Sequence, residues 1–311
     1  MASSASRLSF KFLTEMNRVP KVSVLMPSYN YARYLPASIE SVLSQSYSDL
    51  ELIITDDCST DESREVVEHF RRLDKRVVPV LHDVNHGLAR ARNSGLAVSS
   101  GEFVALCDAD DVWLPNKLKT QMDCFRAQPE LGLVHCDSAI IDGEGKLTGE
   151  RFSSLLHRKG QAKSGNLFEV LCERNFLCVP TVILRREAIQ YAGGFEESLR
   201  SLEDWVCWAK VSRKYPFFYI EEALVHYRIH GAGLSSNPKG MATNRVKAVR
   251  LLLESFSDIP PHLRSRMLYS LGVSYLEIKD TRDAVQAFVD SIRANPLHLR
   301  SWARCCQSLL S

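Results

Sequence analysis

The sequence predicts an α/β fold, with parallel strands flanked by helices, that ends in an α-helical extension. Short apolar runs alternate with segments of helical periodicity at intervals of about 25 to 30 residues, which is typical of βαβ units. Beyond residue 240 the apolar residues recur at helical spacing alone. We therefore expect a loose arm over residues 1–19, an α/β domain over 20–240 and a helical segment over 241–311.

The composition of the chain restricts the class of protein to which it can belong. The chain has 311 residues, of which 45% are hydrophobic, and this is enough to bury a large core. A formal net charge of +2 does not favour nucleic acid as a partner. The nine cysteines form no CxxC pair, which favours reduced thiols and a cytoplasmic protein. No window approaches the roughly 20 apolar residues of a membrane span, so we expect at most peripheral attachment to the inner face of a membrane.

The first two strands each lead into a polar loop. The elements expected here are a strand over 22–27, a helix beginning near 36, a strand over 51–55 and a helix capped within 59–61. Tyr29 and Asn30 follow the first strand, and Asp56 and Asp57 follow the second. These loops offer an aromatic face and hydrogen-bond acceptors, which is what a nucleoside base needs.

The next unit is a strand over 77–81 and a helix over 88–98. Gly87 can bring the backbone close to a ligand at the start of this helix, a position suited to anions. Arg90 and Arg92 lie two residues apart and cannot share a helix face. We expect Arg92 to point into the site and Arg90 to be solvated.

The strand over 103–106 breaks into three carboxylates, Asp108, Asp110 and Asp111. Ligands of α/β folds bind at the carboxyl ends of the strands. Asp108 and Asp110 lie on the same side of an extended segment, so that both can reach one divalent cation. The alternative is an ordinary acidic loop.

The second half of the domain is read less clearly. A strand over 133–136, a turn over 142–145 and a strand running into a helix over 180–187 are expected. Residues 149–165 show no periodicity, and the segment is either a mobile loop near a ligand or an ordinary surface excursion. Glu203, Asp204 and Trp205 begin a further helix. Trp205 and Trp208 share a face of it, and burial in the core is the alternative to contact with a ligand.

Four blocks resemble family 2 glycosyltransferases, in the expected order and spacing: residues 22–30, 55–61, 85–95 and 107–111. The resemblance covers residues 20 to 238. It implies a GT-A fold, that is, a Rossmann-like mixed sheet flanked by helices. It also implies a nucleotide-diphospho-sugar donor, a divalent cation (Mn²⁺ or Mg²⁺) and inversion at the anomeric carbon. One departure is Cys58, where the family usually has glycine.

The resemblance also implies roles for single residues. Asp204 matches the general base, with Glu203 and Trp205 on the acceptor side. Asp110 matches the direct metal ligand, and His230, in a closing block over 223–235, lies close to metal and diphosphate. The expected donor contacts, including those argued above from the loops, are Pro27, Tyr29, Asn30, Asp56, Asp57, Gly87, Arg92 and Asp108.

The tail resembles a tetratricopeptide repeat, a helical hairpin of about 34 residues. The matching positions are Leu268, Leu271, Gly272, Tyr275, Ala284, Phe288 and Pro296. One repeat cannot bury its own face, so we expect it to pack on the α/β domain or on another copy of the chain, as a homo-oligomer. A peptide-binding groove is the functional alternative.

These observations favour an inverting, metal-assisted glycosyltransferase acting on a saccharide, lipid-linked or protein acceptor. The alternative is a non-catalytic helical-repeat interaction protein that carries a nucleotide-sugar-binding domain. A nucleotidyltransferase would need a basic glycine-rich loop after the first strand, and residues 28–33 do not provide one.

Overall fold

The computed structural model describes residues 21–156, 163–231 and 237–310. In these ranges nine strands form one sheet of order β3-β2-β1-β4-β8-β6-β9-β5, and β7 pairs with β6 at its side. The strands are β1 (Val22–Ser28), β2 (Leu50–Asp56), β3 (Val77–Leu81), β4 (Phe103–Leu106), β5 (Val112–Trp113), β6 (Leu133–Ile141), β7 (Leu147–Arg151), β8 (Ile183–Arg185) and β9 (Phe217–Arg228).

The sheet is mixed. Strands β3, β2, β1 and β4 run parallel, and β8 pairs antiparallel with β4. Ser28 of β1 lies opposite Asp56 of β2, and Leu25 lies opposite Leu106 of β4. Because of this register, the loops after β1, β2 and β4 leave the same edge of the sheet, as the sequence predicts for parallel strands.

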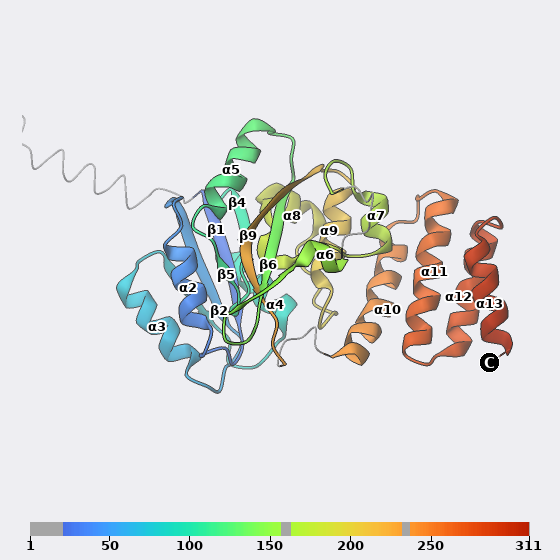
Figure 1. Cartoon of the computed structure of the whole chain (residues 1–311), viewed down its shortest axis with the longest axis horizontal. Helices are drawn as coiled ribbons and strands as arrows, with labels where there is room; N and C mark the ends of the chain where they lie inside the picture. The colour runs from blue at the N-terminus through green and yellow to red at the C-terminus, as the bar shows by residue number, and fades with distance from the viewer. Residues whose placement is uncertain (1–20, 157–162, 232–236, 311) are drawn as a thin grey trace, which may run out of the picture.

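Helices cover both faces of the sheet (Figure 1). Helices α2, α3 and α5 share one hydrophobic cluster with the sheet, and α4, α8 and α9 share the other. The helices are α2 (Leu35–Leu43), α3 (Ser63–Leu73), α4 (Leu88–Val98), α5 (Lys117–Ala127), α6 (Phe152–Leu156), α7 (Phe168–Glu173), the 3₁₀ turn η1 (Val179–Thr181), α8 (Arg186–Ala192), α9 (Glu203–Ser212), α10 (Pro238–Ser255), α11 (Pro261–Glu277), α12 (Thr281–Ala294) and α13 (Leu299–Leu310).

The central strands are buried on both faces, which explains their unbroken apolar runs. Val24 and Met26 of β1 face the cluster formed with α2 and α5, whereas Leu25 between them faces the cluster formed with α4 and α9. Successive side chains of a strand point to opposite faces. An all-apolar strand is therefore what a sheet covered on both sides requires.

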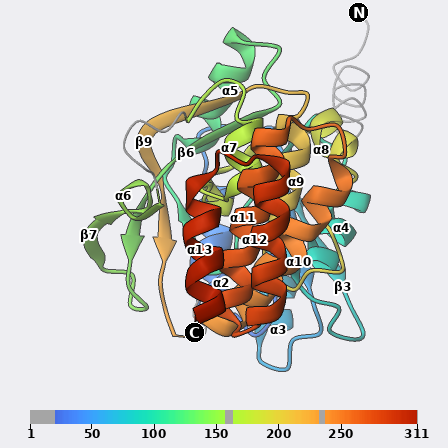
Figure 2. The ribbon, with the colours of Figure 1, turned by 90° about the vertical axis from the view of Figure 1, so that its right-hand side faces the viewer.

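The helical extension continues the core of the α/β domain. Helices α10 to α13 lie side by side and stack outward from α9 in chain order (Figures 1 and 2). Val249 of α10, Phe256 directly after it and Phe288 of α12 belong to the same buried cluster as Trp208 of α9. The expectation that the repeat packs on the α/β domain is confirmed by this cluster. The extension is consequently held in a fixed position relative to the start of α9.

Gly272 allows the close approach of α11 and α12. A Cβ at this position would lie 2.5 Å from Cε1 of Phe288, whose ring is fully buried. Such contacts are too short for any side chain larger than glycine without movement of the ring. The glycine at position 272, one of the positions that match the repeat pattern, is therefore explained by the packing of α11 on α12.

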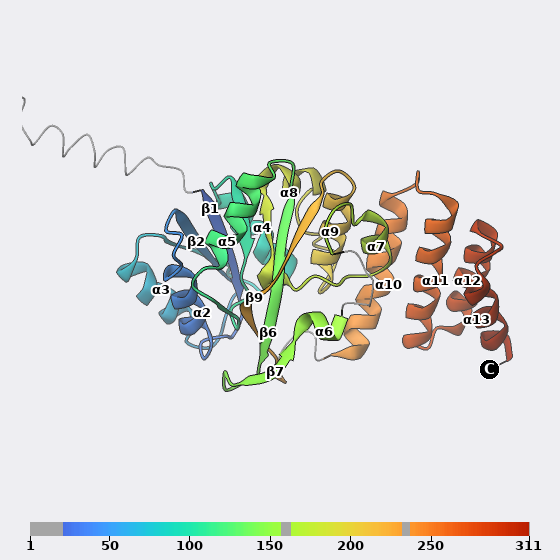
Figure 3. The same ribbon diagram turned by 45° about the horizontal axis from the view of Figure 1, so that its top comes forward.

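The segment over 149–165, expected to be a loop, contains regular structure in its first part. Strand β7 and helix α6 lie there, and α6 extends from the sheet toward α10 (Figure 3). Every residue of β7 is exposed, so the strand has no apolar pattern to reveal it. Residues 157–162 lie outside the described ranges.

Among the described residues, no helix is long and apolar enough to cross a membrane.

Candidate active site

A cleft lies where the strand ends of the parallel sheet meet the start of α9. Its cavity volume is about 1150 Å³. Eleven of the thirteen site residues named from the sequence line it: Pro27, Tyr29, Asp57, Gly87, Arg92, Asp108, Asp110, Glu203, Asp204, Trp205 and His230. Asn30 and Asp56 are not among the described residues that line the cleft.

Asp57 holds the start of α4 against the loop after β2. Its Oδ2 accepts a hydrogen bond from the Gly87 amide at 2.7 Å, and its Oδ1 accepts one from the His86 amide at 2.9 Å. Gly87 has φ 91°, in the region that favours glycine. The carboxylate therefore positions the glycine turn at the cleft wall.

Asp56 and Asn30 do not line the cleft and instead form hydrogen bonds that hold its loops in place. Asp56 is fully buried and accepts hydrogen bonds from Arg64 Nε at 2.7 Å and from the Ser59 amide at 3.0 Å. Asn30 Oδ1 accepts from the Thr60 amide at 2.7 Å, which ties the loop after β1 to the loop after β2. Of the two neighbouring aspartates Asp56 and Asp57, both expected to contact the donor, only Asp57 lines the cleft.

Cys58 adopts a left-handed backbone with φ 66°. An L residue in this region typically costs about 1–2 kcal/mol relative to glycine. Its thiol donates a hydrogen bond to the Asp83 carbonyl at 3.3 Å. This geometry explains why glycine would suit the position better.

The three carboxylates after β4 differ in their surroundings. Asp110 Oδ2 lies 2.9 Å from His230 Nε2, and burial together with the charge of Asp108 raises the pKa of Asp110. Asp111 points away from the cleft and is fully buried. Its Oδ1 accepts a hydrogen bond from the Arg228 amide at 2.8 Å, which ties the end of β9 to this loop. Asp111 is thus structural, and only Asp108 and Asp110 face the cleft.

Arg92 is a buried cation at the centre of the site. Its guanidinium donates to Asp108 Oδ1 at 2.8 Å and to Glu203 Oε1, and only 2% of the side chain is exposed. Arg90, as expected, lies at the surface, where it pairs with Glu197 at 2.9 Å. Arg92 therefore bridges the carboxylate loop after β4 and the start of α9.

The two carboxylates at the start of α9 are placed differently. Burial raises the pKa of Glu203 to about 7, against the pull of the Arg92 guanidinium. Burial also raises the pKa of Asp204, whose Oδ2 accepts a hydrogen bond from Asn175 Nδ2 at 2.9 Å. The preceding Leu202 has φ 68°, a strained backbone that turns the chain into the helix.

The model of the family described as "Glycosyl transferase family 2" matches residues 23–191, which is more than half of the chain. The chain belongs to this family.

Similar proteins agree with this assignment. An uncharacterized glycosyltransferase of Nostoc sp. is 34% identical over 222 residues, which are 68% of this chain and 66% of that protein. The chain thus spans about two thirds of the length of this curated relative.

Two solved structures share the fold. S. aureus TarS 1-349 in complex with UDP-GlcNAc has a TM-score of 0.65 at 20% identity, covering 88% of this chain and 81% of that one. A mannosyltransferase of Pyrobaculum calidifontis in complex with GDP-Man and Mn²⁺ has a TM-score of 0.61 at 18% identity, covering 98% and 88%. These likenesses confirm the GT-A fold.

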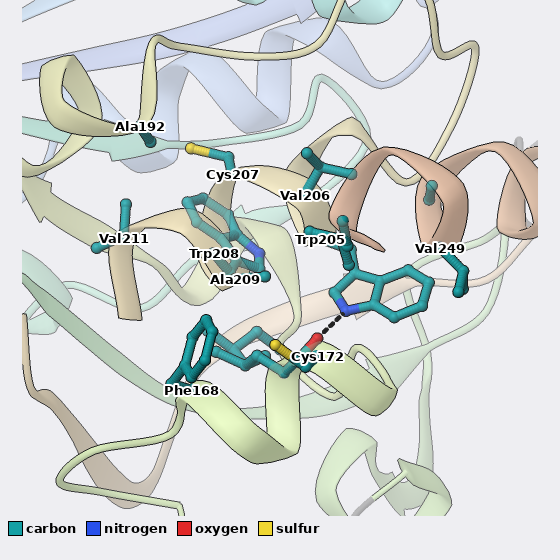
Figure 4. Packing of buried hydrophobic residues seen from close by; sticks show 14 of the residues in the cluster. Phe168, Cys172, Ala192, Trp205, Val206, Cys207, Trp208, Ala209, Val211 and Val249 are labelled. Atoms are coloured by element: carbon teal, nitrogen blue, oxygen red, sulfur yellow. Dashed lines mark hydrogen bonds between the residues drawn. The ribbon is translucent and has the colours of Figure 1, made fainter. Parts of the chain in front are cut away.

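Trp205 and Trp208 of the glycosyltransferase domain pack inside the core (Figure 4). Only 2% of Trp205 and none of Trp208 is exposed, and Trp205 Nε1 donates a hydrogen bond to the Leu171 carbonyl at 2.6 Å. The packing favours the core alternative for both side chains. Trp205 is among the residues that line the cleft, but its side chain is almost fully buried.

Two residues at the site were not singled out from the sequence. Asn175, from the loop after α7, holds the Asp204 carboxylate, and Arg228 donates from Nε to the Asp110 carbonyl at 2.7 Å. Nothing in the spacing of Asn175 links it to Asp204. Arg228 precedes His230 by two residues, and this closeness to a predicted site residue is the signal in the sequence that could have identified it.

Proposed function

We propose that this family 2 glycosyltransferase moves a sugar from a nucleotide-diphospho-sugar to an acceptor hydroxyl by single displacement, with inversion and with Asp204 as general base. The observation that carries the proposal is the contrast at the start of α9. Glu203 is held by the Arg92 guanidinium, whereas Asp204 is held by a neutral amide, that of Asn175. Of these two carboxylates, only Glu203 forms an ion pair with a described cation, and the charge of Arg92 acts on Asp204 without a direct contact.

The environment of Asp204 suits proton transfer. Burial raises its pKa, and a general base is most effective when its pKa lies near the working pH. In the reaction, the acceptor oxygen forms a bond to the anomeric carbon as its proton passes to Asp204. The bond from the anomeric carbon to the nucleoside diphosphate breaks at the same time.

Residues on the opposite side of the cleft would hold the donor. Tyr29 is 44% exposed and can stack on the nucleoside base, and Gly87, which has no side chain, leaves open space for the ligand at the start of α4. The complexes of the two structural relatives with UDP-GlcNAc and GDP-Man support a nucleotide sugar as the ligand.

The carboxylate loop fits a divalent cation. Asp108 and Asp110 both line the cleft, and burial together with the charge of Asp108 raises the pKa of Asp110. Among the described residues no three His, Cys, Asp or Glu side chains gather into a closed site, so diphosphate and water would complete the shell. Mn²⁺ or Mg²⁺ held by Asp110, with His230 beside it, would neutralise charge on the departing diphosphate. The Mn²⁺ complex of the mannosyltransferase supports this choice.

The helical extension is proposed to be tetratricopeptide-like. The hairpin of α11 and α12 and the close contact between Gly272 and Phe288 support this, because small residues at such positions let paired helices approach. Its continuity with the core of the domain favours a role in building the cleft over that of a separate binding module.

The proposal is tested by titrating the full chain with UDP-GlcNAc and with GDP-Man in a calorimeter, with and without Mn²⁺. We expect at least one of the two donors to bind, and Mn²⁺ to tighten its binding by about 10-fold or more. Absence of binding for both donors would contradict the choice of donor class. Binding of equal strength without metal would contradict the role of the cation.

A further inference from the structure

The cleft is longer than a donor site. Its volume of about 1150 Å³ exceeds the roughly 300–1,000 Å³ of ordinary small-molecule pockets. Beyond Asp204 it continues along the helical extension, where α10, α11 and the turn before α13 form one wall. The residues that carry the argument here are Arg200, Arg245, Arg266, Tyr269, His298 and Arg300.

This end of the cleft is rich in guanidinium groups. Arg266 pairs with Glu169 at 2.6 Å, and Arg245 pairs with Glu277 at 2.8 Å. Arg200 and Arg300 have no carboxylate within ion-pair distance in the part of the chain that the structure describes. The wall therefore carries positive charge that its own acidic residues do not balance, although the whole chain has a net charge of only +2.

The pKa of His298 is lowered by burial and, further, by the positive charges of the neighbouring Arg300 and Arg266. Its ring packs against that of Tyr269, with centroids 5.2 Å apart, and Tyr269 belongs to the lining of the cleft. Aromatic faces next to guanidinium groups suit a ligand that combines sugar rings with anionic groups.

The position of this wall is fixed by packing. Helix α10 contacts α9 and α7, and Arg266 on α11 reaches Glu169 and Glu173 on α7. The arginines are therefore held at a set distance from Asp204, on the side away from the loops proposed to hold the donor.

We propose that this basic wall binds the acceptor, and that the acceptor carries carboxylate or phosphate groups beside the hydroxyl that receives the sugar. The inference rests on the proposed function and extends it to the class of acceptor. Guanidinium groups pair with either anion through parallel N–H donors, so both chemistries fit the wall.

The test measures binding of three fluorescently labelled probes by anisotropy: a hyaluronan tetrasaccharide with carboxylates, a glycerol phosphate tetramer, and neutral cellotetraose. We expect at least one anionic probe to bind about 10-fold or more tightly than cellotetraose, with the advantage shrinking at 0.5 M NaCl. The tighter of the two anionic probes identifies the anion.

The double variant Arg200→Gln, Arg300→Gln should lose most of this preference, about 10-fold in affinity for the anionic probe. Both side chains are exposed, so the fold should be unaffected. The matched control is Arg264→Gln, Arg282→Gln, which removes two exposed arginines of the helical extension that lie outside the cleft. It should keep the wild-type preference.

Equal binding of all three probes, or equal losses in the two double variants, would overturn the inference. Titration of the same samples with UDP-GlcNAc and GDP-Man distinguishes failure of the inference about the basic wall from failure of the proposed function. Donor binding that persists while the anionic preference is missing would reject the basic wall alone. Missing donor binding would reject the function on which it rests.

Discussion

Replacing Asp204 by Asn should lower the rate of sugar transfer by about 10²- to 10⁴-fold, the usual contribution of a general base. Asparagine keeps the size of the side chain, and its carbonyl can still accept the hydrogen bond that Asn175 donates at 2.9 Å. The donor should bind as before, because its proposed contacts lie on the loops after β1, β2 and β4. The measurement is transfer rate together with calorimetric donor affinity.

Glu203→Gln is the matched control, one residue earlier in the same helix turn. It should leave the rate much less affected. Its expected cost is in stability, up to about 3–5 kcal/mol, because Arg92 would lose the buried one of its two carboxylate partners. A larger rate loss in Glu203→Gln than in Asp204→Asn, measured on folded protein, would show that Glu203 is the base.

Replacing Asp110 by Ala should abolish the metal-dependent part of donor binding. We expect the affinity measured with Mn²⁺ to fall to the metal-free value, which is a loss of the whole Mn²⁺ effect, about 10-fold or more. The fold should survive, because burial and the charge of Asp108 already disfavour the ionised Asp110 carboxylate. His230 would keep its ring contact with Tyr34, whose centroid lies 5.1 Å away.

Asp137→Ala serves as control for this variant. Asp137 is a buried aspartate outside the cleft, and its Oδ2 accepts a hydrogen bond from Ser153 Oγ at 2.6 Å. Its removal should lower stability and leave the effect of Mn²⁺ unchanged. Retention of the Mn²⁺ effect in Asp110→Ala would rule this carboxylate out as the metal ligand.

Much of the fold could be predicted because burial leaves a pattern in the sequence. Strands covered on both faces must be apolar throughout, and helix α4 was predicted over the same residues, 88–98, that it occupies. Strand β7 was missed because all of its residues are exposed, and it is fixed only by pairing with β6. Pairing between distant segments has no local signal.

The site was predictable where it follows the ends of strands. Asp57, Asp108 and Asp110 lie on loops whose common edge follows from parallel topology. What escaped prediction depends on tertiary contacts. Asp111 turns away because β9 pairs with β5 and brings the Arg228 amide to it. Arg266 of the basic wall reaches the cleft because α11 packs on α7, and the other arginines of the wall come from three further segments of the chain.

The most direct test of the central claim is the anomeric configuration of the first sugar released. In the absence of an acceptor, water can take the place of the attacking hydroxyl, and proton NMR can follow slow hydrolysis of the α-linked donors UDP-GlcNAc and GDP-Man with Mn²⁺. Single displacement with Asp204 as base predicts that the β-anomer appears first, before mutarotation, and that Asp204→Asn slows its appearance. First release of the α-anomer, or an unchanged rate in Asp204→Asn, would contradict the mechanism.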